Sequence, residues 1–189
     1  INKKEGVFMI DINVQGTEAF NEETNEFIEI PECVLTLEHS LISISKWESR
    51  WHKPFLDKHD KTREETIDYI KCMTINKNVP AIVYDFLSND VITKVNAYIS
   101  NPMTATVINK KRENTAPSTE PVTSEMIYYW MISLNIPVEF EKWHLNRLLT
   151  LIQVCNIKNT PRKKMNPTEL AKRNTALNAA RLKRYHTRG

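Results

Sequence analysis

The sequence predicts an α+β fold that is mainly α-helical, in which a small N-terminal β-sheet of two or three strands precedes a helical bundle and a basic C-terminal helix. Alternation of apolar and polar residues, which is typical of strands, is confined to residues 9–39. Beyond them, apolar residues recur at steps of three and four, as on one face of a helix. Only three glycines are present, all near a terminus, which argues against a fold rich in tight hairpin turns.

Three segments in the first part of the chain are expected to be strands. They are "MIDINV" at 9–14, "EFIEI" at 26–30 and "CVLTLEH" at 33–39, and the segment "NEETNE" between the first two is turn-like. These strands form the predicted N-terminal sheet.

The next segment, "SLISISKWESRWHKPFL", is expected to form a helix. Its residues Ile44, Trp47, Trp51 and Phe55 share one face, and the helix should end near Pro54, which cannot continue it.

A second helix should begin at the capping box Thr62-Arg63-Glu64-Glu65, in which the Thr hydroxyl and the Glu carboxylate satisfy free amides of the first turn. Short helices are expected at 80–87 and 89–100. The stretch at 109–123 is polar, contains proline and lacks a period, so it is predicted to be a loop.

The most apolar part of the chain predicts two central helices. The first carries Ile127, Trp130, Met131 and Leu134 on one face and stops before Pro137. The second, in "VEFEKWHLNRLLTLIQVCNIKN", repeats this spacing with Leu145, Leu148, Leu149 and Ile152. With Pro137 between them, an antiparallel helical hairpin is the simplest geometry.

The C-terminal segment is a strongly basic tail. Asn166 suits an N-cap, Pro167 the first helical position and Glu169 the capping box, so a helix should start here. Residues 158–189 hold ten Lys or Arg and one Glu, a net charge of +9, and because the whole chain carries +3, residues 1–157 carry −6. This asymmetry favours an anionic partner or an intersubunit contact.

The predicted organisation has three parts. Residues 1–8 precede the first methionine, and Lys4-Glu5-Gly6 can be encoded by AAGGAGG, the purine run that bacterial ribosomes recognise before a start codon. We therefore expect 1–8 to be a non-native leader and Met9 the start, with a true N-terminal arm or an expression remnant as the alternatives. Residues 9–158 should form one globular domain and 159–189 the tail.

No motif for catalysis, a cofactor or a metal is present. The sequence lacks glycine-rich phosphate loops, HExxH and GxSxG, and Cys33, Cys72 and Cys155 are isolated. Four histidines have a notable neighbour: Glu38-His39, Trp51-His52, His59-Asp60 and Trp143-His144. Adjacent residues do not converge on one substrate atom, so we expect neither enzymatic activity nor a cofactor, although motifs cannot reveal a site assembled from distant residues.

The candidate sites are therefore partner-binding residues. Trp143 and Arg147 are of residue types that are frequent at interface hot spots. The favoured alternative is structural: Trp143 packs between helices, and Arg147 pairs with Glu139 or Glu141. The full candidate set is Trp143, Arg147, Arg162, Lys163, Lys164, Lys172, Arg173, Arg181, Lys183 and Arg184.

Several segments resemble a family of proteins encoded by long-tailed bacteriophages and prophages. They are "SLISISKWESRWHKPFL", "TIDYIKCMTI", "NPMTAT", "TSEMIYYWMISLNIPVEFEKWHLNRLLTLIQVCNIKN" and "LNAARLKRYHTRG", and the likeness covers Met9 to Gly189 except the loop near 109–120. Members of the family resemble tail assembly chaperones, which hold the tape-measure protein soluble during tail assembly. The resemblance implies no catalytic or ligand residues.

The expected function is therefore phage tail morphogenesis, with the tape-measure protein as partner and self-association as a further expectation. A structural virion protein of the neck, tail or baseplate is the first alternative, and a nucleic-acid-binding accessory protein that uses "PRKK" and the tail is the second. The acidic body argues against nucleic acid. Without an apolar run long enough to span a bilayer, we expect the host cytoplasm or the virion as its location and no membrane partner.

Overall fold

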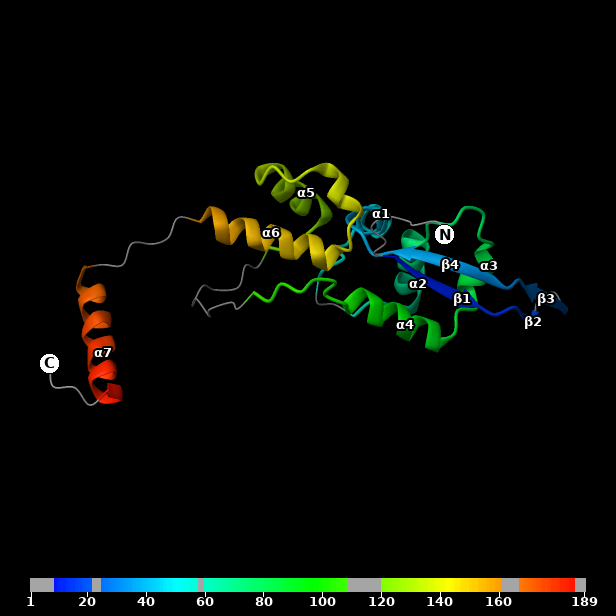
Figure 1. The fold of residues 1–189 in the computed structure, drawn as a ribbon. Coiled ribbons are helices and arrows are strands. Elements are labelled where there is room, and N and C mark those ends of the chain that lie inside the picture. The colour runs from blue at the N-terminus through cyan, green and yellow to red at the C-terminus, as the bar shows by residue number, and fades with distance from the viewer. Residues whose placement is uncertain (1–8, 22–24, 58–59, 109–119, 161–166, 186–189) are drawn as a thin grey trace, which may run out of the picture. The chain divides into compact units, whose positions relative to one another are not determined.

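The computed structural model describes residues 9–21, 25–57, 60–108, 120–160 and 167–185, and it confirms the mainly helical α+β class (Figure 1). The predicted leader at 1–8, most of the predicted loop at 109–123 and the basic residues at 162–164 lie outside these ranges. The chain divides into two compact units, Ile1–Asn156 and Ile157–Gly189, and each is described by itself.

The N-terminal region contains four strands rather than the predicted two or three. They are β1 (Met9–Val14), β2 (Thr17–Asn21), β3 (Glu26–Ile30) and β4 (Cys33–Glu38). β1 pairs antiparallel with β4 and β2 pairs antiparallel with β3, giving two sheets of two strands each. The three predicted strands are confirmed. β2 was missed because "TEAFN" has one large apolar residue, so its pairing with β3 rather than its own pattern defines it.

The break between the two sheets lies at Gly16 and Pro31, within what is otherwise one long hairpin. Pro31 has no backbone N–H to donate to a ladder. Gly16 approaches the opposite chain so closely that a Cβ there would lie 3.1 Å from the Glu32 nitrogen and 3.3 Å from the Ile30 oxygen. A larger residue at Gly16 would therefore force the two strands apart.

Six helical segments follow the strands before the last long helix of the first unit. They are α1 (Leu41–Trp51), α2 (Arg63–Met73), α3 (Ala81–Asp85), α4 (Asn89–Ser100), α5 (Ser124–Ser133) and the 3₁₀ helix η1 (Val138–Lys142), with α6 (Leu145–Asn159) after them. The helix expected in "SLISISKWESRWHKPFL" forms, but it ends at Trp51, so Phe55 lies outside the helix with which it was grouped. The helices expected at 80–87 and 89–100 are confirmed, the first as the short α3, and so is the Thr62–Glu65 capping box. Among the described residues, no helix is both long and apolar enough to cross a membrane.

The core forms where β1 and β4 meet the helices. Ile12, Leu35 and Leu37 are buried on one face of the β1–β4 sheet, in the same cluster as Ile44 of α1 and Leu148 of α6. Because the same cluster draws on strand, α1 and α6 residues, the burial of each element depends on the others.

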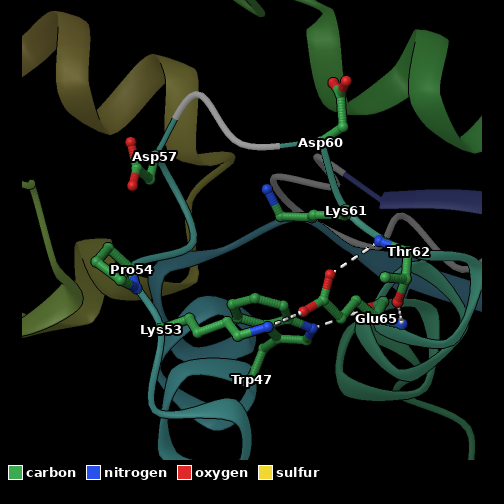
Figure 2. A pocket seen from close by; sticks show the side chains of 8 residues that line it. All are labelled: Trp47, Lys53, Pro54, Asp57, Asp60, Lys61, Thr62 and Glu65. Atoms are coloured by element: carbon green, nitrogen blue, oxygen red, sulfur yellow. Dashed lines mark hydrogen bonds and ion pairs between the residues drawn. The ribbon is translucent and has the colours of Figure 1, made fainter.

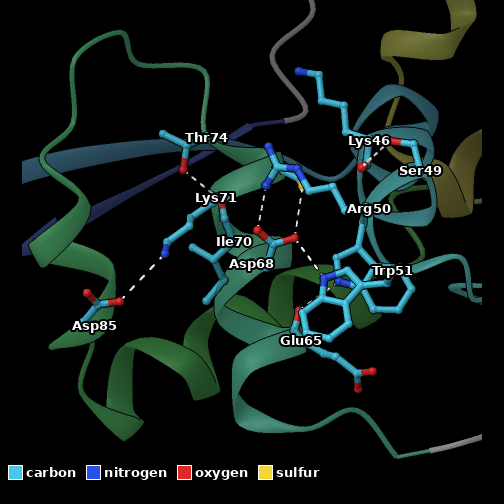
Figure 3. Close-up of polar contacts among 12 residues, drawn as sticks. Lys46, Ser49, Arg50, Trp51, Glu65, Asp68, Ile70, Lys71, Thr74 and Asp85 are labelled. Atoms are coloured by element: carbon cyan, nitrogen blue, oxygen red, sulfur yellow. Dashed lines mark hydrogen bonds and ion pairs between the residues drawn. The ribbon is translucent and has the colours of Figure 1, made fainter.

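Polar contacts fix α1 against α2 beside this core. The Trp47 indole N–H donates to the Glu65 carbonyl at 2.9 Å. Figure 3 shows the Asp68 carboxylate of α2 accepting from Arg50 at 2.6 Å and from the Trp51 indole at 3.0 Å. The aromatic face predicted for α1 therefore packs on α2.

A buried carboxylate links α1 to α5. The Glu48 carboxylate accepts from the Phe55 backbone N–H and from the Ser124 backbone N–H, each at 2.8 Å. Ser124 is the first residue of α5, so Glu48 satisfies an amide that the helix itself leaves free.

The helix predicted from Val138 onward is not continuous. Val138–Lys142 form the 3₁₀ helix η1, Trp143 is extended, and α6 begins at Leu145. The reason is a tertiary contact: the Leu145 N–H donates to the His39 carbonyl at 2.9 Å, and Ser40 and His144 form an isolated β-bridge. The backbone at 144–145 therefore pairs with the start of α1. Of the apolar stripe predicted for α6, Leu145, Leu148 and Ile152 are buried and Leu149 is partly buried.

The second unit contains α7 (Pro167–Tyr185). The helix starts at the predicted proline, whose missing N–H costs nothing in the first turn. The predicted cap, Asn166, lies outside the described residues.

Candidate partner-binding surfaces

Trp143 and Arg147 belong to one aromatic and cationic stack, which we call the Phe140–Trp143–Arg147 stack. The rings of Phe140 and Trp143 are parallel within 13°, with centroids 4.1 Å apart. The Arg147 guanidinium carbon lies 4.3 Å from the centroid of the Trp143 ring, a cation–π distance. All three residues are partly buried. The two sequence candidates are thus in contact with each other, on one side of the α6 N-terminus.

The structure also shows a group of exposed apolar residues that the sequence pattern did not predict. Tyr129 and Ile132 of α5 and Val138 of η1 are 67%, 72% and 60% exposed. We call these three residues the α5–η1 surface. Periodicity identified the buried side of α5 through Ile127 and Met131, but the all-apolar run "MIYYWMI" was the signal that the outer side is apolar too.

The predicted face of α5 is buried to different degrees. Ile127 and Met131 are buried, whereas Trp130 and Leu134 are only partly buried. Exposed carboxylates, Glu125 in the first turn of α5 and Glu139 in η1, lie in the same elements as the α5–η1 surface. A partner with apolar residues flanked by cations would match this combination.

The five tail candidates that the structure describes all lie on α7 with exposed side chains: Lys172, Arg173, Arg181, Lys183 and Arg184. The other three, Arg162, Lys163 and Lys164, lie outside the described residues.

The arginines and lysines occupy different sides of α7. At about 100° per residue, Arg173, Arg181 and Arg184 fall on the side of Leu170 and Leu177, and Lys172 and Lys183 fall on the opposite side. We call the first side the arginine–leucine face. Leu170 and Leu177 are each 45% exposed, so this face is both cationic and apolar.

Two histidines converge although sequence reasoning had set their neighbourhoods aside. The rings of His39 and His144 meet edge to face with centroids 4.9 Å apart, and both are buried. His39 Nδ1 lies 2.6 Å from the Tyr69 hydroxyl, and the His144 Nε2–H donates to the Tyr98 carbonyl at 3.1 Å. The two residues of each adjacent pair do not meet at one point, but His39 of the first pair and His144 of the last are in contact. In the sequence, each of these histidines follows an acidic or aromatic residue and precedes a helix. This pattern is too common to predict that the two rings are in contact.

Burial holds both imidazoles neutral. Loss of solvent, followed by the nearby His144, lowers the pKa of His39 to about 3, and burial also lowers the pKa of His144. His144 Nδ1 is buried and has no hydrogen-bond partner among the described residues. Both rings are buried, and their contacts connect the start of α1 with α2, α4 and the start of α6.

A cavity lies at the connection between α1 and α2 (Figure 2). It measures about 380 Å³, and its lining includes Trp47, Lys53, Lys61 and Glu65. The Glu65 carboxylate binds Lys53 at 2.7 Å and accepts from the Thr62 N–H at 2.8 Å. Lys61 donates to the Phe55 carbonyl at 2.7 Å. These charged groups already serve intramolecular contacts that close the α1–α2 connection.

The cysteines and acids among the described residues are not grouped as metal ligands. In the part of the chain that the structure describes, no three His, Cys, Asp or Glu side chains are grouped to hold an ion. Cys33, Cys72 and Cys155 are free thiols, and burial raises the pKa of Cys72 to about 11.

Comparisons with protein-family models, with curated proteins and with solved structures found no match to this chain.

Proposed function

We propose that the protein is a bacteriophage tail assembly chaperone that binds apolar helical segments of the tape-measure protein and catalyses no reaction. The observation that carries the proposal is the α5–η1 surface, which exposes three large apolar side chains on consecutive elements. The segment "TSEMIYYWMISLNIPVEFEKWHLNRLLTLIQVCNIKN", which carries the phage resemblance, contains that surface.

The chemistry of the surface suits an amphipathic helix. A tape-measure helix presents an apolar stripe that must be kept from water until the tail tube encloses it, and a helical partner covers such a stripe by apolar contact. Fully burying a side chain such as Ile or Val contributes roughly 1.5–3 kcal/mol. Because Tyr129, Ile132 and Val138 are still mostly exposed, most of this gain is left for a partner.

The Phe140–Trp143–Arg147 stack adds aromatic and cationic groups in η1 and at the start of α6. Trp and Arg are the residue types that most often dominate interface energies, and the Arg147 guanidinium carbon lies 4.3 Å from the centroid of the Trp143 ring. A pre-ordered arginine loses less conformational entropy on binding than a free one. We therefore assign Trp143 and Arg147 to this interface.

The test is binding of the purified protein to overlapping tape-measure fragments. The double variant Tyr129→Ala/Ile132→Ala should bind at least about tenfold more weakly, because each truncation at an apolar anchor costs about 1 kcal/mol or more. Val34→Ala/Ile75→Ala is the matched control, since both residues are exposed apolar side chains that lie outside α5 and η1. Unchanged affinity in the first variant would show that α5–η1 is not the contact.

Two further outcomes separate the alternatives. If no fragment binds and the protein is abundant in purified virions by mass spectrometry, it is a structural virion protein. If it binds duplex DNA tightly at physiological salt, with affinity that falls steeply as salt rises, it is a nucleic-acid-binding protein. Either result would overturn the chaperone assignment.

A further inference from the structure

One face of the β2–β3 hairpin combines paired carboxylates with paired aromatic rings. In the antiparallel register, Glu18 lies opposite Glu29 and Phe20 lies opposite Phe27. Because side chains two residues apart on a strand share a face, these four side chains lie together, and we call them the hairpin face. The phenyl rings meet at 60° with centroids 5.1 Å apart, yet Phe20 and Phe27 are 50% and 72% exposed.

The hairpin also holds the negative charge of the body. Residues 15–33 contain six glutamates and no Lys or Arg, so their net charge of −6 equals that of residues 1–157 as a whole. The six are Glu18, Glu22, Glu23, Glu26, Glu29 and Glu32. The rest of the body is therefore electrically balanced, and a cationic partner is attracted to the hairpin in particular.

Both features of the hairpin face are unfavourable while it faces water. Like charges directly opposite each other on a sheet repel, and the exposed Phe20–Phe27 pair leaves apolar surface hydrated. One partner that carries cations beside apolar side chains would remove both costs. The hairpin face thus specifies the chemistry of what covers it.

The arginine–leucine face of α7 has that chemistry and a matching spacing. Arg173 and Arg181 each lie four residues from Leu177, which is about 6 Å along a helix. Glu18 lies two residues from Phe20, which is about 6.5 Å along a strand. A guanidinium can therefore meet a carboxylate while Leu177 covers the phenyl pair.

We propose that the β2–β3 hairpin of one molecule binds the α7 helix of a second copy, by arginine–carboxylate pairing around a leucine–phenylalanine contact. Each copy carries one hairpin and one α7, so the contact is head to tail. Such a heterologous contact generates rings or open filaments rather than a closed dimer. The inference goes beyond recognition of a tape measure and does not depend on it.

The test is sedimentation velocity of the full chain over a range of protein concentrations, at about 50 mM and 500 mM salt. The protein should form species larger than a monomer as its concentration rises at low salt, and high salt should dissociate them. The hairpin variant Glu18→Lys/Glu29→Lys and the tail variant Arg173→Glu/Arg181→Glu should each associate at least tenfold more weakly.

A charge exchange gives the sharpest result. In an equimolar mixture, the two lysines introduced into the hairpin face of the first variant meet the two glutamates introduced into the arginine–leucine face of the second, and the unaltered hairpin of the second meets the unaltered tail of the first. The mixture should therefore associate more strongly than either variant does alone. Lys172→Glu/Lys183→Glu is the matched control, because it makes the same charge change on the opposite side of α7 and should associate far better than Arg173→Glu/Arg181→Glu.

Three results would overturn the proposal. The first is a wild-type protein that stays monomeric at every concentration at low salt. The second is association that the hairpin variant, shown to be folded by its circular dichroism and melting curve, does not weaken. The third is a monomer that becomes more extended on charge reversal, independently of concentration, because the tail would then bind its own chain.

Discussion

At the scale of single residues, the contact between His39 and His144 makes stability depend on pH. The folded-state pKa of His39 is lowered to about 3 from an ordinary value of 6.5, chiefly by burial, so the unfolded chain binds a proton more readily than the folded one. The contribution of His39 to the free energy of unfolding is fully present above pH 6.5 and is lost as the pH falls toward 3. The pKa of His144 is lowered in the same direction.

We predict that acidification between pH 6.5 and 4.5 lowers the free energy of unfolding, by roughly 1 kcal/mol per pH unit from His39, with His144 contributing in the same direction. The measurement is a series of urea melts of wild type, His39→Gln and His144→Gln. Each variant should show a shallower pH dependence than wild type, because carboxylate titration is common to all three. Equal slopes in all three proteins would mean that the buried imidazoles do not titrate on unfolding.

At the scale of elements, equivalent leucines on different helices should differ sharply in their contribution. Leu148 of α6 is fully buried in the core, whereas Leu177 of α7 is about half exposed. Leu148→Ala should lower the free energy of unfolding by about 2–5 kcal/mol, and Leu177→Ala by less than about 0.5 kcal/mol. Denaturant melts of the two variants check this. A loss below about 1 kcal/mol for Leu148→Ala would remove α6 from the core.

The intermediate burial of Trp130 also corrects an expectation at this scale. Its place in the apolar spacing of α5 predicts full burial, but the side chain is only partly buried. Trp130→Ala should therefore cost less than the roughly 3–5 kcal/mol of a fully buried tryptophan, because part of the ring remains in water in the folded state. The same melts give the value.

At the scale of the whole molecule, the basic tail helix and the hydrophobic core lie in different compact units. The described side chains of α7 are exposed, and its unit begins at Ile157. Deleting residues 160–189 should therefore change the free energy of unfolding of the body by less than about 0.5 kcal/mol, while abolishing salt-sensitive self-association. Thermal melting and sedimentation of the truncated protein measure the two effects. A large loss of body stability would show that the tail is part of the folded core.

The truncated protein also separates the two proposals. If it still captures tape-measure fragments, the α5–η1 surface is sufficient for binding and the tail serves contact between copies. If capture is lost while the body stays folded, the basic residues of the tail contact the partner directly.

The sequence by itself determined the features that depend on neighbours along the chain. The fold class, three strands, the Thr62 capping box, the start of α7 at Pro167 and the buried stripe of α6 were predictable, because period and caps act over a few residues. The charge asymmetry follows from counting alone.

Only the tertiary structure decided which distant segments meet. It placed His39 against His144, ended η1 through the contact of Leu145 with His39, and paired "TEAFN" with β3. It also showed that α5 exposes Tyr129 and Ile132, which belong to the same apolar run as the buried Ile127 and Met131. An apolar residue in the sequence indicates only that its side chain is more stable out of water. The positions of the other elements determine which sides of a helix are covered.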